Sequence, residues 1–117
     1  KDYYGLDDGK MDVVFNGVDT ERFVPDSNKT DEKLKVLFSA GNFRLKGLRP
    51  LLLAAGEIAK ERKDFQVVVM GRGRKERYEN TIDHLGIRNM VMFHGETSNP
   101  EMVYREAGVL AHPTFYD

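Results

Sequence analysis

Residues 36–47, VLFSAGNFRLKG, determine the fold that the sequence predicts. The stretch begins with apolar and β-branched residues typical of a buried strand, is interrupted by a Gly-Asn pair, and continues as a helix after Gly47. In an open parallel sheet, ligands bind beyond the carboxyl ends of the strands, where the next helix directs its N-terminus at them. Because Arg44 and Lys46 occupy this strand-to-helix loop, the residues alone predict an anion-binding site there.

The same alternation of strand and helix continues along the chain. The expected strands, short and rich in apolar residues, cover residues 35–40, 65–70, 90–94 and 109–112. The expected helices, with apolar residues at helical spacing, follow Gly47 and cover about 75–85 and 100–107. Strands joined through helices by short connections predict an α/β protein with a Rossmann-like, doubly wound parallel sheet.

The residues before this pattern are predicted to be less regular. A short strand is expected at residues 10–15, KMDVVF, and a structured loop at 16–23, with one helical turn capped by Asp19. A catalytic cluster of Asp19, Glu21 and Arg22 is the alternative, although a local cap and ion pair is the more ordinary interpretation.

Composition excludes several classes of function. The 117 residues fit one domain, and the net charge of −1 gives no global reason to expect binding to nucleic acid or an anionic membrane. The chain has no cysteine, which excludes thiolate catalysis and cysteine-based metal sites. No run approaches the roughly 20 apolar residues of a membrane span. A start without Met, and an end just after a strand-like segment, lead us to expect a piece of a longer protein.

Basic residues gather after two strands that are predicted to be parallel neighbours. The first group consists of Arg44, Lys46 and Arg49, and the second of Arg72, Arg74, Lys75 and Arg77. Two such groups on one rim favour a phosphate-bearing ligand. Ligand contact is the favoured interpretation for Arg44 and Lys46, whereas Arg74, Lys75 and Arg77 are interpreted as the solvated start of a helix.

The Gly71-Arg72-Gly73 turn resembles part of a dinucleotide fingerprint, but the third glycine of that motif would fall at Glu76. This mismatch counts against an NAD site, although Glu96 could still act as a ribose-binding acid. We interpret the glycines as a turn that lets the backbone approach a ligand.

The three histidines show no metal-ligand spacing. His94 ends a strand at the predicted rim and could contact a base or sugar, although a structural role is the more common one; His84 and His112 are interpreted as a surface residue and a loop tether. The methionines are interpreted as core fillers; they are Met70, Met90, Met92 and Met102.

Five segments, in order along the chain, resemble the C-terminal, donor-binding domain of retaining glycosyltransferases of the GT-B fold, the "group one" family. They are VVFNGVDTERFVP, LKGLRPLLLAA, FQVVVMGRG, NMVMFHGE and MVYREAGVLAHPTFYD. The forms FRLKGL and HPTFYD look closest to the lipopolysaccharide core glucosyltransferase branch.

The resemblance implies a nucleotide-diphosphate sugar as donor substrate, such as UDP-glucose, and transfer with retention and without a metal or other cofactor. Lys46 matches the family lysine at the donor diphosphate, and Arg44 is a candidate substitute for an arginine that would fall near residue 41. Gly71 and Arg72 match the turn near the base and diphosphate, and His94 and Gly95 lie where the family lines the base pocket.

The resemblance also implies parts that these residues do not contain. A paired-glutamate motif should follow residue 117, and an acceptor-binding domain should precede residue 1. Residues 1–33 would then be the interdomain linker, and residues 34–117 a partial donor-binding domain with no catalytic residue of its own and no activity alone. A glycolipid or polysaccharide acceptor would bind the missing domain, in a cytoplasmic protein that associates with the membrane surface. A non-catalytic nucleotide- or phosphate-binding module is the alternative.

Overall fold

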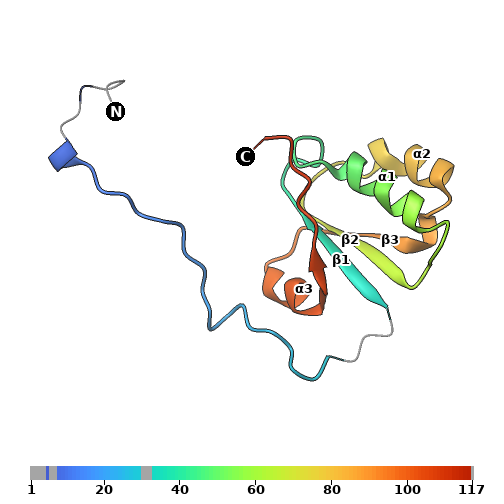
Figure 1. Ribbon diagram of the computed structural model, residues 1–117, viewed down its shortest axis with the longest axis horizontal. Helices are drawn as coiled ribbons and strands as arrows, with labels where there is room; N and C mark the ends of the chain where they lie inside the picture. The colour runs from blue at the N-terminus through green and yellow to red at the C-terminus, as the bar shows by residue number, and fades with distance from the viewer. Residues whose placement is uncertain (1–4, 6–7, 30–32, 117) are drawn as a thin grey trace.

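The computed structural model describes residues 5, 8–29 and 33–116, and their strands form one parallel sheet in the order β3-β2-β1-β4 (Figure 1). In chain order the elements, with η marking a 3-10 helix, are η1 (Asp8–Lys10), β1 (Leu34–Ser39), α1 (Leu48–Ile58), β2 (Phe65–Met70), α2 (Glu76–Leu85), η2 (Arg88–Met90), β3 (Val91–Gly95), α3 (Pro100–Glu106) and β4 (Val109–Leu110). The predicted α/β class with a Rossmann-like parallel sheet is confirmed.

The two central strands are buried on both faces because helices cover both sides of the sheet. Phe38 of β1 points to the face covered by α1 and α2, whereas its neighbour Leu37 points to the face covered by α3. This alternation follows from the two-residue period of a strand. It explains why β1 and β2 read as continuous apolar runs in the sequence.

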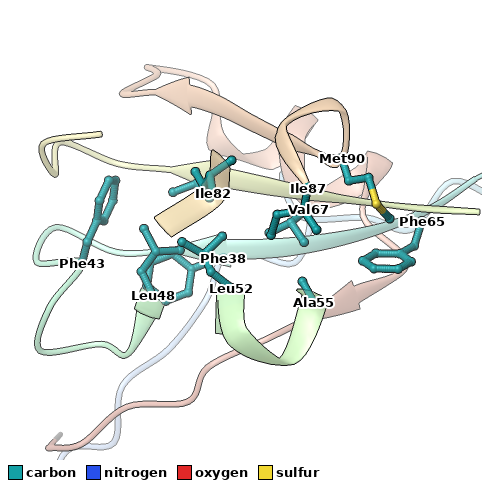
Figure 2. Packing of buried hydrophobic residues seen from close by; sticks show 11 residues of the cluster. Phe38, Phe43, Leu48, Leu52, Ala55, Phe65, Val67, Ile82, Ile87 and Met90 are labelled. Atoms are coloured by element: carbon teal, nitrogen blue, oxygen red, sulfur yellow. The ribbon is translucent and has the colours of Figure 1, made fainter. Parts of the chain in front are cut away.

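The larger core lies between the sheet and helices α1 and α2 (Figure 2). Leu48 and Leu52 of α1 are fully buried there, and Ile82 of α2 is 3% exposed. α2 ends at Gly86, which has φ of 67° and caps the helix in the left-handed conformation that glycine adopts most readily. The helical periodicity read from the sequence therefore predicted the correct buried faces.

The smaller core lies under α3, and it corrects two expectations. Val103 and Ala107 pack on Leu37, Val68 and Met70. Met92 and Met102, two of the four methionines predicted to fill the core, are instead 41% and 51% exposed. α3 has only seven residues and packs over the central strands, so the outer part of this face stays open.

The expected strand at residues 10–15 is wrong. These residues form no strand, and Val13, Val14 and Phe15 are each more than 80% exposed. A strand needs a neighbour for its backbone hydrogen bonds, and in the described part of the chain this segment extends away from the sheet (Figure 1). At the other end, β4 stops at Leu110 rather than at residue 112.

The turn at residues 19–23 is confirmed and is attached to α3. The Asp19 carboxylate accepts the backbone N–H groups of Glu21 and Arg22 at 3.0 and 3.1 Å, as a capping residue does. Arg22 does not pair locally: its guanidinium lies 2.8 Å from the Glu101 carboxylate of α3, and Phe23 packs edge-on against Tyr104. The hydrogen bond and charge of Arg22 hold the pKa of Glu101 below its usual value.

Candidate functional site

The carboxyl ends of the four parallel strands meet at one edge of the sheet. From β1 the chain moves through β2 to β3 on one side, and then returns to place β4 on the other side of β1. The order of the strands therefore reverses between β1 and β4. In open α/β sheets such a switch point is where ligands bind.

The loop after β1 is closely packed against the segment that follows β4. Gly47 has φ of 83°, and a Cβ atom there would lie 2.0 Å from the carbonyl oxygen of Pro113. Within the loop, the Asn42 side-chain oxygen accepts the N–H of Leu45 at 3.0 Å. The backbone N–H of Phe115 donates to the Leu45 carbonyl at 3.1 Å. Glycine at residue 47 is thus required by a close contact as well as by its backbone angle.

Lys46 lies at the switch point. Its ammonium donates to the carbonyl oxygen of Tyr116 at 3.3 Å, so the side chain lies beside the segment after β4. This cation is held at the reversal of strand order by a loop fixed through Gly47.

The loop after β2 is fitted against the loop after β1 by two glycines. Gly71 has φ of 129°, its N–H donates to the Gly95 carbonyl at 2.9 Å, and a Cβ atom would lie 1.8 Å from the Ala40 carbonyl oxygen. A Cβ atom on Gly73 would lie 2.2 Å from the ring of Phe43. The sequence predicted that these glycines let the backbone approach a ligand. In the structure, the backbone at both glycines lies against the neighbouring loop.

An open cleft of about 430 Å³, which we call the edge cleft, lies at the carboxyl ends of β1, β2 and β3. Its lining residues are Ser39, Ala40, Gly41, Met70, Gly71, Arg72, Glu96, Thr97 and Pro100. Arg72 and Glu96 face each other across it with 3.0 Å between Nε and Oε1, and both side chains remain more than half exposed. The cleft offers backbone groups, one cation and one carboxylate, a set that suits a polar ligand with hydroxyl and phosphate groups.

The sequence identified only part of this lining. Gly71 and Arg72 were predicted and are present, and Glu96 had been considered only as the acid of an NAD site. Thr97 and Pro100 were missed as site residues, although their position directly after a strand at the predicted rim was a usable signal.

A second cleft, of about 310 Å³, adjoins the edge cleft at Gly41 and Arg72. We call it the arginine cleft, since four of its nine lining residues are arginines; the nine are Gly41, Asn42, Phe43, Arg44, Arg72, Gly73, Arg74, Arg77 and Tyr78. Arg74 and Arg77 had been interpreted as a solvated helix start, and their place beside Arg44 is decided by the packing of the two loops. Lys46 does not line this cleft, so Arg44 and Lys46 do not meet there.

His94 and Gly95, predicted to line the base pocket, are the last two residues of β3 and have different surroundings. His94 is on the strand face that α3 covers, and it lines a small hollow with Met92, Met102 and Glu106. The Gly95 carbonyl accepts the hydrogen bond from Gly71. Neither residue lines the edge cleft or the arginine cleft.

The described residues hold neither a cluster of metal-ligating side chains nor a helix suited to a membrane. Among residues 5, 8–29 and 33–116, no three or more histidine or acidic side chains are grouped so that they could hold a metal ion. In the same residues, no helix has the length and apolar character needed to cross a membrane.

The sheet order and the clefts at its carboxyl edge define a Rossmann-like α/β domain. The chain belongs to a particular family of such domains, the glycosyl transferases group 1, whose sequence pattern matches residues 19–117. A D-inositol 3-phosphate glycosyltransferase from Paenarthrobacter aurescens (strain TC1) is 28% identical over 128 residues, which cover 97% of this chain and 31% of that protein. The chain thus spans about a third of the length of this relative.

Solved structures share the fold. The C-terminal domain of LpcC, a glycosyl transferase group 1 family protein from Francisella tularensis, has a TM-score of 0.66 at 21% identity and covers 80% of this chain and 57% of that one. TarM has a TM-score of 0.70 at 14% identity, and the match covers 81% of this chain and 19% of TarM. The lipopolysaccharide outer core galactosyltransferase WaaB has a TM-score of 0.62 at 22% identity, and the match covers 97% of this chain and 33% of WaaB. The fold is therefore that of the C-terminal domain of a GT-B glycosyltransferase.

Proposed function

We propose that this chain supplies the donor-binding part of a retaining glycosyltransferase and holds a nucleotide-diphosphate sugar. The observation that carries the proposal is the position of the edge cleft in a group 1 family member, at the carboxyl ends of three strands and next to the strand-order switch point. This is where a Rossmann-like sheet offers free backbone groups to a phosphorylated ligand.

Lys46 is the residue that we propose neutralises the donor diphosphate. As the bond between sugar and diphosphate breaks, negative charge grows on the leaving group, and a fixed cation lowers the energy of that state. The tight loop ending at Gly47 and the segment after β4 hold the Lys46 ammonium at the switch point. Arg44, the second predicted cation, lines the arginine cleft instead, and we do not include it in the diphosphate site.

We propose that the edge cleft holds the nucleoside, and that the diphosphate extends from it toward Lys46, which lies at the switch point outside the cleft lining. Glu96 can accept hydrogen bonds from ribose hydroxyl groups, and Arg72, its ion-pair partner, can turn to a phosphate oxygen because both side chains are exposed. Gly71 shapes this end through its contact with Ala40. His94 and Gly95, predicted to line the base pocket, have other surroundings, so we propose that the loop at residues 96–97 takes their place.

The finer assignment rests on likeness to named proteins. WaaB and WaaG, a glycosyltransferase involved in lipopolysaccharide biosynthesis, support a role in lipopolysaccharide core synthesis. UDP-glucose is the donor that we propose on the resemblance of the sequence. The Paenarthrobacter relative instead supports a phosphorylated small acceptor, through its name. We propose that residues 1–33 link this domain to an acceptor-binding domain, and that the 117 residues alone do not turn over a donor.

Titration of the protein with UDP, followed by calorimetry, tests the donor site. Lys46→Ala should weaken UDP binding about 10- to 100-fold, because a hydrogen bond to a charged group contributes roughly 1.5–3 kcal/mol. Lys60→Ala removes the same charge from the far end of α1, where the ammonium pairs with Glu57, and should leave the affinity unchanged. Equal affinity of the Lys46→Ala variant and the unsubstituted protein would reject Lys46 as a diphosphate ligand.

A second measurement separates the transferase from a non-catalytic nucleotide-binding module. In the longer protein that we propose contains this chain, Lys46→Ala should lower kcat with UDP-glucose by about 100-fold or more, as does the loss of one oxyanion donor. Binding of UDP with no transfer to any saccharide acceptor by that longer protein would favour the module.

A further inference from the structure

We infer that the arginine cleft is a second anion site, which binds a ligand carrying two phosphate groups and is separate from the site proposed for the donor diphosphate. The lining supplies four guanidinium groups, from Arg44, Arg72, Arg74 and Arg77, and no carboxylate. In a protein whose net charge is −1, this concentration of positive charge in one cleft is local and specific.

The arginines of this cleft are mostly not neutralised by the protein itself. Within the part of the chain that the structure describes, Arg44, Arg74 and Arg77 make no ion pair with a carboxylate. Arg72 pairs with Glu96, but across the neighbouring edge cleft and with both side chains largely exposed. Like charges held close together repel one another, and a multivalent anion bound among them would remove that repulsion.

The cleft is held in shape by the hydrophobic core. Phe43, 4% exposed, lies at the loop end of the larger core (Figure 2), and its ring packs edge-on against Phe38 at 5.9 Å and Tyr78 at 6.1 Å between centroids. The ring also fills the space that a Cβ atom on Gly73 would occupy. The loops that carry Arg44 and Arg74 are thereby fixed against each other, so less conformational entropy is lost when a ligand binds between them.

The chemistry of the lining indicates phosphate. The planar guanidinium group presents two parallel N–H donors that match two phosphate oxygens, and four such groups exceed what a single phosphate needs. Tyr78 adds a hydroxyl donor, because a phenol is protonated at neutral pH, and burial raises its pKa further against the opposing effect of Arg77 and Arg44. A ligand with two phosphates, free or as part of a lipid headgroup, fits this set of donors.

The second site adjoins the proposed donor site and differs from it in three of its four arginines, Arg44, Arg74 and Arg77. The two clefts share only Gly41 and Arg72, and Lys46 lines neither of them but lies at the switch point. Failure of the donor proposal would appear in the Lys46→Ala variant, whereas failure of the present inference would appear in variants of Arg44 and Arg77. The two outcomes are therefore distinguishable.

Calorimetric titration with inorganic pyrophosphate tests the inference on the purified protein. The double variant Arg44→Gln/Arg77→Gln should bind pyrophosphate at least about tenfold more weakly than the unsubstituted protein. Arg49→Gln removes the same charge from an exposed position near the same loop but outside the cleft lining, and should leave binding unchanged. The Lys46→Ala variant should retain binding at the arginine cleft, and circular dichroism would verify that each variant is folded.

Flotation with phosphatidylcholine vesicles, with and without phosphatidylinositol 4-phosphate, whose headgroup carries two phosphates, identifies the source of the phosphate. Retention by the phosphatidylinositol 4-phosphate vesicles that is lost in the double variant would assign the cleft to lipid headgroups, and pyrophosphate binding alone would assign it to free phosphorylated ligands. Equal binding of both probes by the double variant and the unsubstituted protein would overturn the inference, as would an equal loss in the Arg49→Gln variant.

Discussion

Replacement of Gly71 by alanine should separate the two loops that form both clefts. Gly71 has φ of 129°, and a Cβ atom there would lie 1.8 Å from the carbonyl oxygen of Ala40, a backbone atom that cannot turn away. The backbone angle alone costs a side chain roughly 1–3 kcal/mol. Overpacking against a fixed neighbour adds about 1–3 kcal/mol. We therefore expect the free energy of unfolding to fall by about 3 kcal/mol or more.

The assay is urea unfolding followed by circular dichroism, with two other glycines of the same loops as references. Gly73→Ala should have an intermediate effect, because its Cβ atom would meet the Phe43 ring at 2.2 Å without a positive φ. Gly41→Ala should change stability by no more than about 1 kcal/mol, since no atom lies within 4 Å of its Cβ position. The loss in free energy of unfolding should therefore be largest at residue 71, smaller at residue 73 and smallest at residue 41. If Gly71→Ala proved as stable as Gly41→Ala, the contact between the loops would be refuted.

The remaining predictions concern the core and the linker turn. Leu52→Ala should destabilise the protein by roughly 2–5 kcal/mol in urea unfolding, because Leu52 is fully buried. Leu53→Ala, at a residue 44% exposed, should cost much less, and similar costs would contradict the assigned face of α1. Because Arg22 lowers the pKa of Glu101, their ion pair should stabilise the docked turn at neutral pH, and that contribution should be lost as the pH falls below the ordinary value of 4.5 and through the lowered pKa. In Arg22→Gln the Glu101 pKa, followed by NMR titration, should rise toward 4.5, and an unchanged pKa would argue against the pair.

The attachment of residues 19–23 to α3 bears on how the proposed two-domain enzyme would move. Arg22 contacts both Glu101 and the Ser98 carbonyl, within a few residues of the edge cleft at Thr97 and Pro100. The turn therefore moves with the donor-binding part, whereas residues 11–18 are largely exposed. If residues 1–33 form the linker that we propose, this attachment places its bending on the N-terminal side of Asp19.

The sequence by itself was sufficient for the fold class and for most elements. Local patterns indicate which face of an element is buried and where the element ends. Here they are the apolar runs of β1 and β2, the helical spacing of Leu48, Leu52 and Ile82, and the glycine after α2. Residues 10–15 show the limit of this reasoning. Their β propensity is real, but a strand exists only where another strand pairs with it, and that depends on the rest of the structure.

Only the tertiary structure decided which cations share a cleft. Arg44 and Lys46 are two residues apart, yet Lys46 reaches the segment after β4, while Arg44 joins Arg74 of the next loop and Arg77 of the first turn of α2. The cause is the packing of Phe43 on Gly73 and of Gly47 on Pro113, contacts between residues at least 30 positions apart. Propensity and spacing describe neighbours along the chain, and a site assembled by long-range contacts becomes visible only once the chain is folded.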